Sequence, residues 1–150
     1  MARAGNRSGR LGAEELRERL RASNTAKQFG FVLETAEPGH VVLEMRVGER
    51  HKQIHGVVHG GVIAALADTA GGLATYMARP RGMRAATIEM KINYLEAVEK
   101  GSVRADARVV RMGTHIAVVD CNVRDESRLV AKALMTFFVS PFKRGGTKKR

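Results

Sequence analysis

The longest periodic segment of the chain runs from residue 60 to residue 78. Its apolar side chains recur at intervals of three or four residues, the spacing that places them on one face of an α-helix: Ile63, Leu66, Ala67, Ala70, Leu73, Ala74 and Met77. The run stops at Arg79-Pro80-Arg81-Gly82, where proline and glycine end a helix. The pattern therefore predicts one long amphipathic helix in the middle of the chain.

Most of the remaining sequence has a period of two, which is typical of β-strands. The alternation is clearest over 102–110, where small apolar residues alternate with charged ones. Strands are also predicted over 28–36, 40–47, 114–123 and 129–140, and the period-two pattern before residue 102 begins at Thr87. A short charged helix is predicted over 13–22. Runs of strands around one helix predict an α+β fold, with an antiparallel sheet wrapped around the long central helix.

Composition is that of one globular domain with 150 residues, 44% of them hydrophobic. No segment approaches the ~18 consecutive apolar residues of a membrane span, and the basic N-terminus lacks the apolar run of a secretory signal. Cys121 is the single cysteine, which excludes an internal disulfide and suits a reducing compartment. We therefore expect a cytoplasmic protein.

The net charge of +11 is concentrated at the two ends of the chain. Residues 1–12 and 142–150 contain no acidic residue and supply eight of these charges, so we expect two basic disordered tails around a domain over 13–141. Aromatic residues make up 5% of the chain and tryptophan is absent, which gives little support for a platform that stacks nucleic-acid bases. We expect no specific nucleic-acid partner.

The second face of the long helix combines small residues with one carboxylate: Gly60, Gly61, Ala64, Asp68, Gly71, Gly72 and Thr75. A glycine inside a helix costs about 0.5–1 kcal/mol relative to alanine, and the close approach of another backbone is the usual compensation. This face suggests that something packs or docks against Asp68. A solvated Asp68 on an exposed face fits the same pattern.

The start of this helix has the chemistry of an oxyanion site. The first helical turn leaves backbone N–H groups free at the positive end of the helix dipole, and glycines at positions 60 and 61 leave room for a ligand oxygen. Gly60 and Asp68 are eight residues apart, about 12 Å along the axis, so one reacting group cannot touch both within one helix. If the two cooperate, Asp68 must come from a second subunit of a two-fold dimer with antiparallel helices.

The stretch from His51 to Gly61 (HKQIHGVVHGG), continuing through Leu66-Ala67-Asp68 to Gly71, resembles hotdog-fold acyl-CoA thioesterases of the phenylacetyl-CoA thioesterase (PaaI-like) type. The resemblance extends to Thr87–Leu95 (TIEMKINYL) and covers about residues 29–139. It implies a hotdog fold and hydrolysis of an acyl- or aryl-CoA thioester to the free acid and CoA. It also implies a homodimer that can pair into a homotetramer, and no cofactor, because coenzyme A is part of the substrate.

The resemblance assigns roles to five positions. The Gly60 N–H would polarise the thioester carbonyl, and Asp68 of the partner subunit would act as general base or nucleophile. Thr87 would position the water or the carboxylate, although it could also be an ordinary strand residue. Gln53, where close relatives often have asparagine, would hold the attacking water or contact the thioester. His59 would orient the loop or hydrogen-bond near the leaving thiolate.

The resemblance places coenzyme A contacts at the helix start and at a bend between two later strands. Gly61 belongs to the first group, and Arg111, Gly113, Thr114 and His115 form the second. Relatives commonly place arginine or lysine directly after that glycine, whereas this chain has Thr114. Phosphate binding would therefore rely on Arg111, on His115 or on a basic residue elsewhere.

Several alternatives remain open at this stage. His51, His55 and His59 could bind a metal from one helical face, but the glycines among them make such a helix improbable, so no metal site is expected. Tyr76 and Met77 could line an acyl pocket or close the core. A hotdog dehydratase or hydratase would need an acid and a base beside the acyl chain, such as a histidine with a carboxylate. A non-catalytic acyl-CoA-binding regulator could use the basic tails on nucleic acid.

Overall fold

The computed structural model describes residue 9 and residues 11–142. The basic residues of the two predicted tails lie outside this part of the chain, so the tails stay a prediction. The elements follow one another as α1 (Ala13–Ala22), α2 (Asn24–Phe29), β1 (Phe31–Glu37), β2 (His40–Arg46), η1 (Glu49–His51), α3 (Gly60–Ala78), β3 (Met83–Tyr94), β4 (Ser102–Met112), β5 (Ile116–Arg124) and β6 (Leu129–Pro141).

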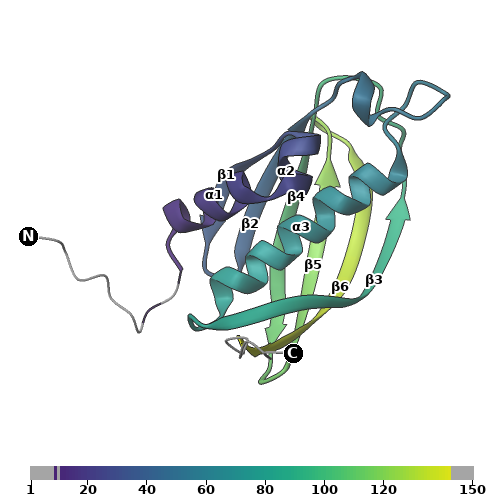
Figure 1. Ribbon diagram of the computed structural model, residues 1–150. Helices are drawn as coiled ribbons and strands as arrows, with labels where there is room; N and C mark the ends of the chain where they lie inside the picture. The colour runs from purple at the N-terminus through teal and green to yellow at the C-terminus, as the bar shows by residue number, and fades with distance from the viewer. Residues whose placement is uncertain (1–8, 10, 143–150) are drawn as a thin grey trace, which may run out of the picture.

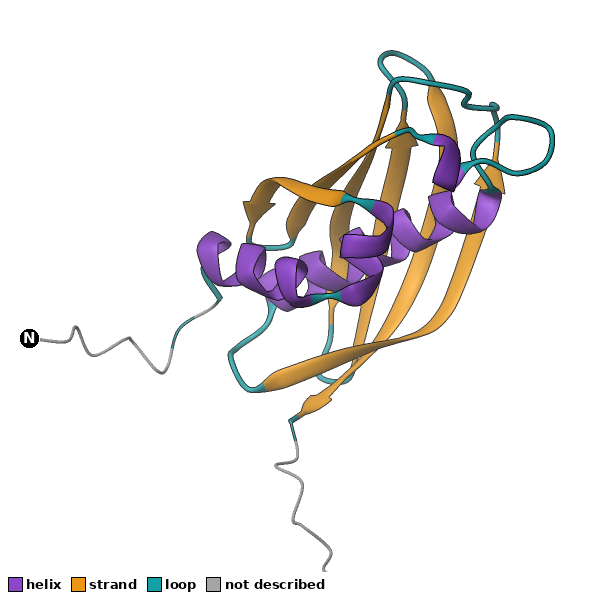
Figure 2. Ribbon diagram, turned by 45° about the horizontal axis from the view of Figure 1, so that its top comes forward, coloured by secondary structure: helices purple, strands orange, loops and turns teal. Residues whose placement is uncertain are grey.

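The strands form one six-stranded sheet in the order β1-β2-β4-β5-β6-β3, and every neighbouring pair is antiparallel. Figure 1 shows the long helix α3 lying across one face of the curved sheet. Figure 2 shows α1 and α2 on the same side as α3. This arrangement confirms the predicted α+β architecture, in which a sheet wraps around one long helix. The strands β1 and β3 form the two open edges.

Helix α3 has the predicted boundaries because its apolar stripe is the centre of the core. Leu66, Ala67, Ala70 and Ala74 are completely buried against the sheet. The small size of the alanines brings the helix close to β4, where Ala105 and Ala107 are also small and fully buried, as expected for dense packing. Helix α3 is long and apolar enough to cross a membrane, but the core helices of soluble proteins share these two properties. Half of α3 is buried inside the protein.

The glycine pair in the middle of α3 has a different cause from the one expected. Gly71 is buried and faces β6 of the same chain, where a Cβ atom at this position would lie 2.6 Å from Met135 Cε and 3.2 Å from Phe137 Cε2. Thr75 is buried on the same side and donates its hydroxyl to the Gly71 carbonyl at 3.0 Å. The expectation that another backbone approaches the small-residue face is therefore wrong for Gly71 and Thr75. Side chains of the sheet fill that space.

Alanine substitutions should separate the two glycines. At Gly72 a Cβ atom would make an ordinary contact, 3.7 Å from Phe137, so Gly72→Ala is expected to raise the free energy of unfolding by about 0.5–1 kcal/mol. At Gly71 the same gain is opposed by crowding in the core, which typically costs about 1–3 kcal/mol. In urea unfolding, the free energy of unfolding of Gly71→Ala should be lower than that of Gly72→Ala by at least about 1 kcal/mol. Equal free energies would contradict this account of the packing.

Two boundaries differ from the sequence-based prediction. Residues 28 and 29 were assigned to the first strand, but they close helix α2, which begins after Ser23 and ends at Gly30. The Ser23 hydroxyl accepts the Ala26 N–H, and Gly30 takes the left-handed conformation with φ of 70°. Both capping residues indicate a short helix, but the period-two pattern of the following residues favoured a strand. In addition, β3 begins at Met83, earlier than Thr87.

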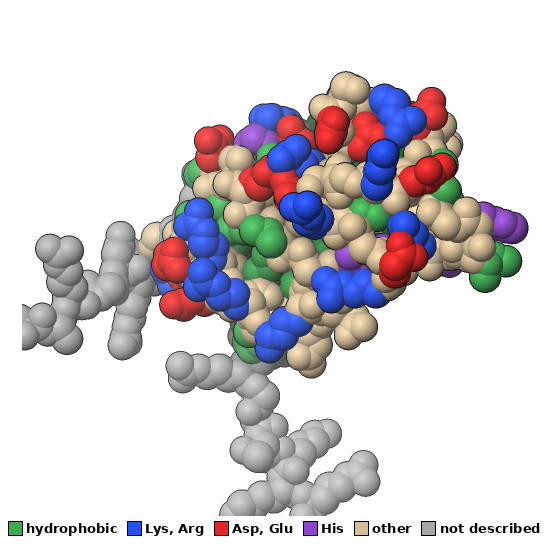
Figure 3. Space-filling view, turned by 90° about the horizontal axis from the view of Figure 1, so that it is seen from above, with side chains coloured by type: hydrophobic (Ala, Val, Ile, Leu, Met, Phe, Trp, Pro, Cys, Tyr) green, Lys and Arg blue, Asp and Glu red, His purple; other side chains and the backbone are tan. Residues whose placement is uncertain are grey.

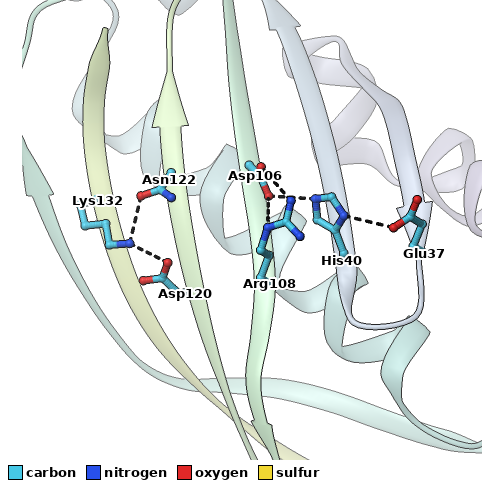
Figure 4. Close-up of polar contacts among 7 residues, drawn as sticks. All are labelled: Glu37, His40, Asp106, Arg108, Asp120, Asn122 and Lys132. Carbon is cyan, nitrogen blue, oxygen red and sulfur yellow. Dashed lines mark hydrogen bonds and ion pairs between the residues drawn. The ribbon is translucent and has the colours of Figure 1, made fainter.

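The outer face of the sheet is held by lateral polar pairs (Figure 4). Lys132 lies directly across from Asn122 and bonds to it at 2.9 Å, and it also reaches Asp120 at 2.6 Å. His40 on β2 and Asp106 on β4 are joined at 2.9 Å. Such cross-strand pairs stabilise a sheet face that meets water. The predicted catalytic side chain of β3, Thr87, lies on the opposite face, towards α3.

Charge is mixed over the part of the chain that the structure describes. Figure 3 shows Lys and Arg side chains interspersed with Asp and Glu on the face seen from above, with hydrophobic atoms exposed among them. Arg104, for example, donates to Glu34 at 2.8 Å across the strands. Cys121 is buried in the core, and burial raises the pKa of its thiol to about 12.

Candidate active site

The carboxylate predicted to act in catalysis is joined to a strand residue. Asp68 is half-buried on α3, and Thr87 of β3 donates its hydroxyl to Asp68 Oδ1 at 2.7 Å. This hydrogen bond fixes the orientation of the carboxylate and leaves lone pairs on its other oxygen for a further donor. The structure thus brings Asp68 and Thr87 together, while their part in a reaction stays a prediction.

A groove of about 480 Å³ opens beside this pair. It lies between α1, α3 and the start of β3, and its walls are mostly apolar: Arg19, Leu20, Ala22, Ser23, Asp68, Thr69, Gly72, Leu73, Tyr76, Ala85, Thr87 and Phe137. Tyr76 therefore lines the groove, whereas its neighbour Met77 is 3% exposed and belongs to the core. A carboxylate at one end of an apolar groove suits a ligand with a reactive polar group and an apolar extension.

The start of α3 leaves one backbone donor free. The N-terminal residue His59 accepts the Gly61 N–H on its Nδ1 atom at 2.8 Å, and its carbonyl accepts the Val62 N–H. Among the described residues the Gly60 N–H has no acceptor. His59 thus has a capping role here, and the Gly61 N–H, predicted to help bind the substrate, is already paired. The positive end of the helix is available through Gly60 alone.

Tyr94 supports the Gly60 peptide from the end of β3, and sequence reasoning assigned it no role. Its hydroxyl donates to the Gly60 carbonyl at 2.9 Å, and its ring would lie 3.2 Å from a Cβ atom at position 60. A second cavity of about 310 Å³ adjoins this contact, lined by Val58, Gly60, Ile63, Tyr94, Leu95, Glu96, Ala97 and Val98. The tyrosine side chain fills the space that the glycine leaves and holds its peptide in place.

A β-bulge allows one strand to contact both the start and the middle of α3. Thr87 pairs with Phe137, but the next paired residue is Glu89, so Ile88 is an extra residue in β3. Thr87 and Tyr94 are seven positions apart, and in a regular strand an odd separation would put them on opposite faces. The bulge shifts the alternation by one residue, so both side chains point to α3.

The loop before α3 does not bring Gln53 to the Asp68–Thr87 contact or to the Gly60–Tyr94 contact. Its side chain accepts the His55 N–H within the same loop at 2.6 Å. His51 is 1% exposed; its Nδ1 accepts the Gly48 N–H and its Nε2 donates to the Phe29 carbonyl. His51 thus has a structural role, whereas His55 is exposed. The three histidines do not share one face.

The predicted coenzyme A contacts lie in the hairpin between β4 and β5. Arg111, Thr114 and His115 are exposed there, and Gly113 closes the turn by donating its N–H to the Ile116 carbonyl at 2.8 Å. Figure 1 shows this hairpin at the end of the sheet opposite to the start of α3. The His115 backbone carbonyl accepts an N–H from β6. The β6 residue that donates this N–H is paired with the β3 residue two positions before Thr87. The hairpin therefore lies near the Thr87 end of β3.

Within one chain the predicted site residues fall into two separate groups, which we call half-sites. One consists of Asp68, Thr87 and the groove, and the other consists of the free Gly60 N–H with Tyr94 and the second cavity. Gly60 and Asp68 are separated by about 12 Å of helix, because each residue advances the axis by about 1.5 Å. One group contains a carboxylate and the other contains a free backbone donor.

Comparison with known proteins identifies relatives of this chain. Residues 55–132 match the sequence model of the thioesterase superfamily. The sequence is 30% identical to the human acyl-coenzyme A thioesterase 13 over 131 residues, which cover 82% of this chain and 93% of the relative.

Two solved structures have the same fold. A thioesterase from Haemophilus influenzae superposes with a TM-score of 0.82 at 28% identity, covering 89% of this chain and 93% of that one. A hypothetical thioesterase from Streptococcus pneumoniae, solved with coenzyme A, superposes with a TM-score of 0.75 at 26% identity, covering 83% and 96%. The fold is thus the hotdog fold of these thioesterases.

Proposed function

The chain belongs to the thioesterase superfamily, and from that premise we propose that it is an acyl-CoA thioesterase that works as a homodimer with two composite sites. Each site combines the Gly60 N–H of one subunit with Asp68 of the other. The observation that carries the proposal is the separation of the candidate oxyanion donor at the start of α3 from the carboxylate in the middle of the same helix, both supported by the same edge strand.

The edge strand β3 supports the dimer. It is 12 residues long, one of its edges is unpaired within the described chain, and it exposes Ile88 by 58% and Tyr94 by 51%. Such a long free edge is a template for pairing with another strand. If two copies of β3 pair antiparallel about a two-fold axis between Met90 and Lys91, Thr87 of one copy lies opposite the partner's Tyr94. That register carries Asp68 toward the partner's Gly60.

The proposed reaction is hydrolysis of the thioester. The Gly60 N–H binds the carbonyl oxygen at the positive helix end, while Asp68 of the partner subunit takes a proton from water. The hydroxide attacks the carbonyl carbon, and the tetrahedral oxyanion forms on the Gly60 N–H. The C–S bond then breaks, and the CoA thiolate leaves and takes up the proton that Asp68 removed from water, which regenerates the carboxylate. Direct attack by the Asp68 carboxylate would give an anhydride that water hydrolyses to the same products.

The remaining assignments follow from this arrangement. The acyl group lies in the groove beside Asp68, and Arg111 and His115 are the nearest candidates for coenzyme A phosphates from the β4–β5 hairpin. The relative solved with coenzyme A supports this substrate class. No cofactor is required by the proposed steps. The single buried Cys121 suits a reducing compartment such as the cytoplasm.

The hydratase alternative is less well supported by the geometry. A hydratase needs an acid and a base beside the acyl chain, such as a histidine with a carboxylate, but the described residues that line the groove include Asp68 and no histidine. Product analysis separates the two reactions, because hydrolysis releases free thiol from an acyl-CoA whereas hydration alters the acyl chain and keeps the thioester.

A complementation assay tests the composite site. Asp68→Ala and Gly60→Pro subunits, each inactive alone, are co-expressed and assayed for thiol release with a panel of acyl-CoAs. Each mixed dimer would contain one site with both defects and one intact site, so random assortment should restore about a quarter of native activity. Activity in neither the mixture nor the native protein would refute the thioesterase proposal. An active native protein without recovery in the mixture would refute the shared site.

Thr87 provides a narrower test of the carboxylate half-site. Thr87→Val keeps the shape of the side chain but removes the donor to Asp68, so kcat should fall about tenfold if orientation of the carboxylate matters. Thr87→Ser keeps a hydroxyl and should retain most of the activity. The comparison is made by thiol release at saturating substrate. Equal kcat for the valine and serine variants would contradict the positioning role.

A further inference from the structure

The arginine that ends α3 is buried without an anionic partner. Arg79 is 3% exposed, and its Nε and Nη1 atoms have no hydrogen-bond partner among the described residues. Its guanidinium lies 4.0 Å from the centre of the Tyr76 ring, a cation–π contact that compensates part of the cost of burial. Burial also lowers the pKa of this side chain to about 10. An unpaired buried cation is costly, and an anion beside it would remove much of that cost.

Two further arginines surround a small cavity beside Arg79. The cavity has a volume of about 80 Å³ and is lined by Leu11, Glu15, Arg19, Arg79, Pro80, Arg81, Gly82 and Met83. Glu15 is the acidic residue of this lining; it contacts Arg81 at 2.7 Å and Arg19 at 3.9 Å. Three guanidinium groups thus line a cavity that contains one carboxylate, and that carboxylate contacts two of them. The cavity is positively charged and large enough for a carboxylate group.

This cavity lies beside the groove that contains Asp68, and the two spaces share one lining residue. Arg19 lines both spaces, and its guanidinium lies 5.5 Å from the Tyr76 ring, which also lines the groove. Asp68 and Tyr76 follow one another along α3 and Arg79 caps its end, and the eleven steps from Asp68 to Arg79 span about 16 Å. The groove beside Asp68 and the arginine cavity are therefore neighbours along α3, with Arg19 at their boundary.

We propose that the groove takes acyl groups that end in a carboxylate, with the terminal carboxylate bound by Arg79 and Arg19 and the hydrocarbon chain lying along Leu73 and Tyr76. This inference rests on the proposed thioesterase function, because it names the acyl class for that site. Guanidinium groups bind carboxylates through paired, charge-assisted hydrogen bonds. The incoming carboxylate would supply the acceptors that Arg79 lacks, while Glu15 stays with Arg81.

The test compares substrates that differ only at the far end. Thiol release is measured for the native protein with adipoyl-, suberoyl- and sebacoyl-CoA against hexanoyl-, octanoyl- and decanoyl-CoA. At the chain length that fits, kcat/KM for the carboxylate-bearing substrate should exceed that of its plain counterpart by about tenfold or more, which corresponds to about 1.4 kcal/mol. In Arg79→Met this ratio should fall to about one or below.

Two more variants keep the test decisive if Arg79→Met does not fold. Arg19→Met changes a side chain that is 51% exposed, so it should fold normally and should also lower the ratio. Arg17→Met removes the same charge from the same helix but lies outside both spaces and contacts Glu14, so the native ratio should persist. A native enzyme that hydrolyses plain acyl-CoAs equally well overturns this inference alone. Absence of thiol release from every substrate overturns the proposed function with it.

Discussion

Asp68→Asn is expected to reduce thiol release by about a hundredfold or more, the usual loss when a positioned base or nucleophile is removed. Asparagine keeps the size of the side chain and can still accept the Thr87 hydroxyl, so the groove should remain intact. The amide cannot take a proton from water at neutral pH and is a poor nucleophile. The loss should therefore appear in kcat, with KM changed little.

A matched control removes a carboxylate from the far side of the sheet. Asp120→Asn weakens an ion pair with Lys132, which keeps its contact with Asn122. Partly exposed pairs of this kind contribute about 0–1 kcal/mol, so activity should stay near the native value. Native activity in Asp68→Asn would show that the reaction does not use this carboxylate. Equal losses in both variants would point to a general effect of charge.

Gly60→Pro is the second large expected effect, a loss of about 100- to 1,000-fold in kcat from removing one oxyanion donor. Proline lacks the backbone N–H but is favoured at the first position of a helix. The preceding residue, His59, already has φ of −63° and ψ of 133°, the extended conformation that a following proline requires. The helix should therefore form as before, which circular dichroism can verify.

Gly60→Ala is the control for crowding. Its Cβ atom would meet the same Tyr94 ring at 3.2 Å, so the ring must move by a few tenths of an ångström, but the N–H is retained. Alanine should keep much more activity than proline. If both variants lose activity equally, the contact with Tyr94 determines the effect, and the oxyanion role of Gly60 is refuted.

The sequence predicts those parts of the molecule that depend on local periodicity. Helix α3 and helix α1 have the predicted boundaries because their apolar spacing and their flanking glycine and proline are local signals. The contact between Asp68 and Thr87 was also anticipated, although from a family resemblance and not from spacing. What the resemblance could not supply was the use of His59 as a helix cap, since that depends on the loop conformation.

Other features could not be predicted because they depend on tertiary register. Nothing in the strand sequence marks Ile88 as an extra residue, since the extra residue is defined only by its pairing with β6. Arg79 followed the helix in a basic, turn-forming segment that is typical of an exposed loop. Its burial arises because α1 and Tyr76 cover it, and the sequence does not state how α1 packs.

Because of the bulge at Ile88, the contacts of Thr87 and Tyr94 with α3 depend on the number of residues between them as well as on their side chains. Deleting one residue between Thr87 and Tyr94 would change no functional group, and the strand could still pair with β6. One of the two side chains would nevertheless turn away from α3, and one half-site would lose its support. In comparisons among relatives, a gap in this strand is therefore more informative than a substitution, because a shorter strand must build its site from other positions.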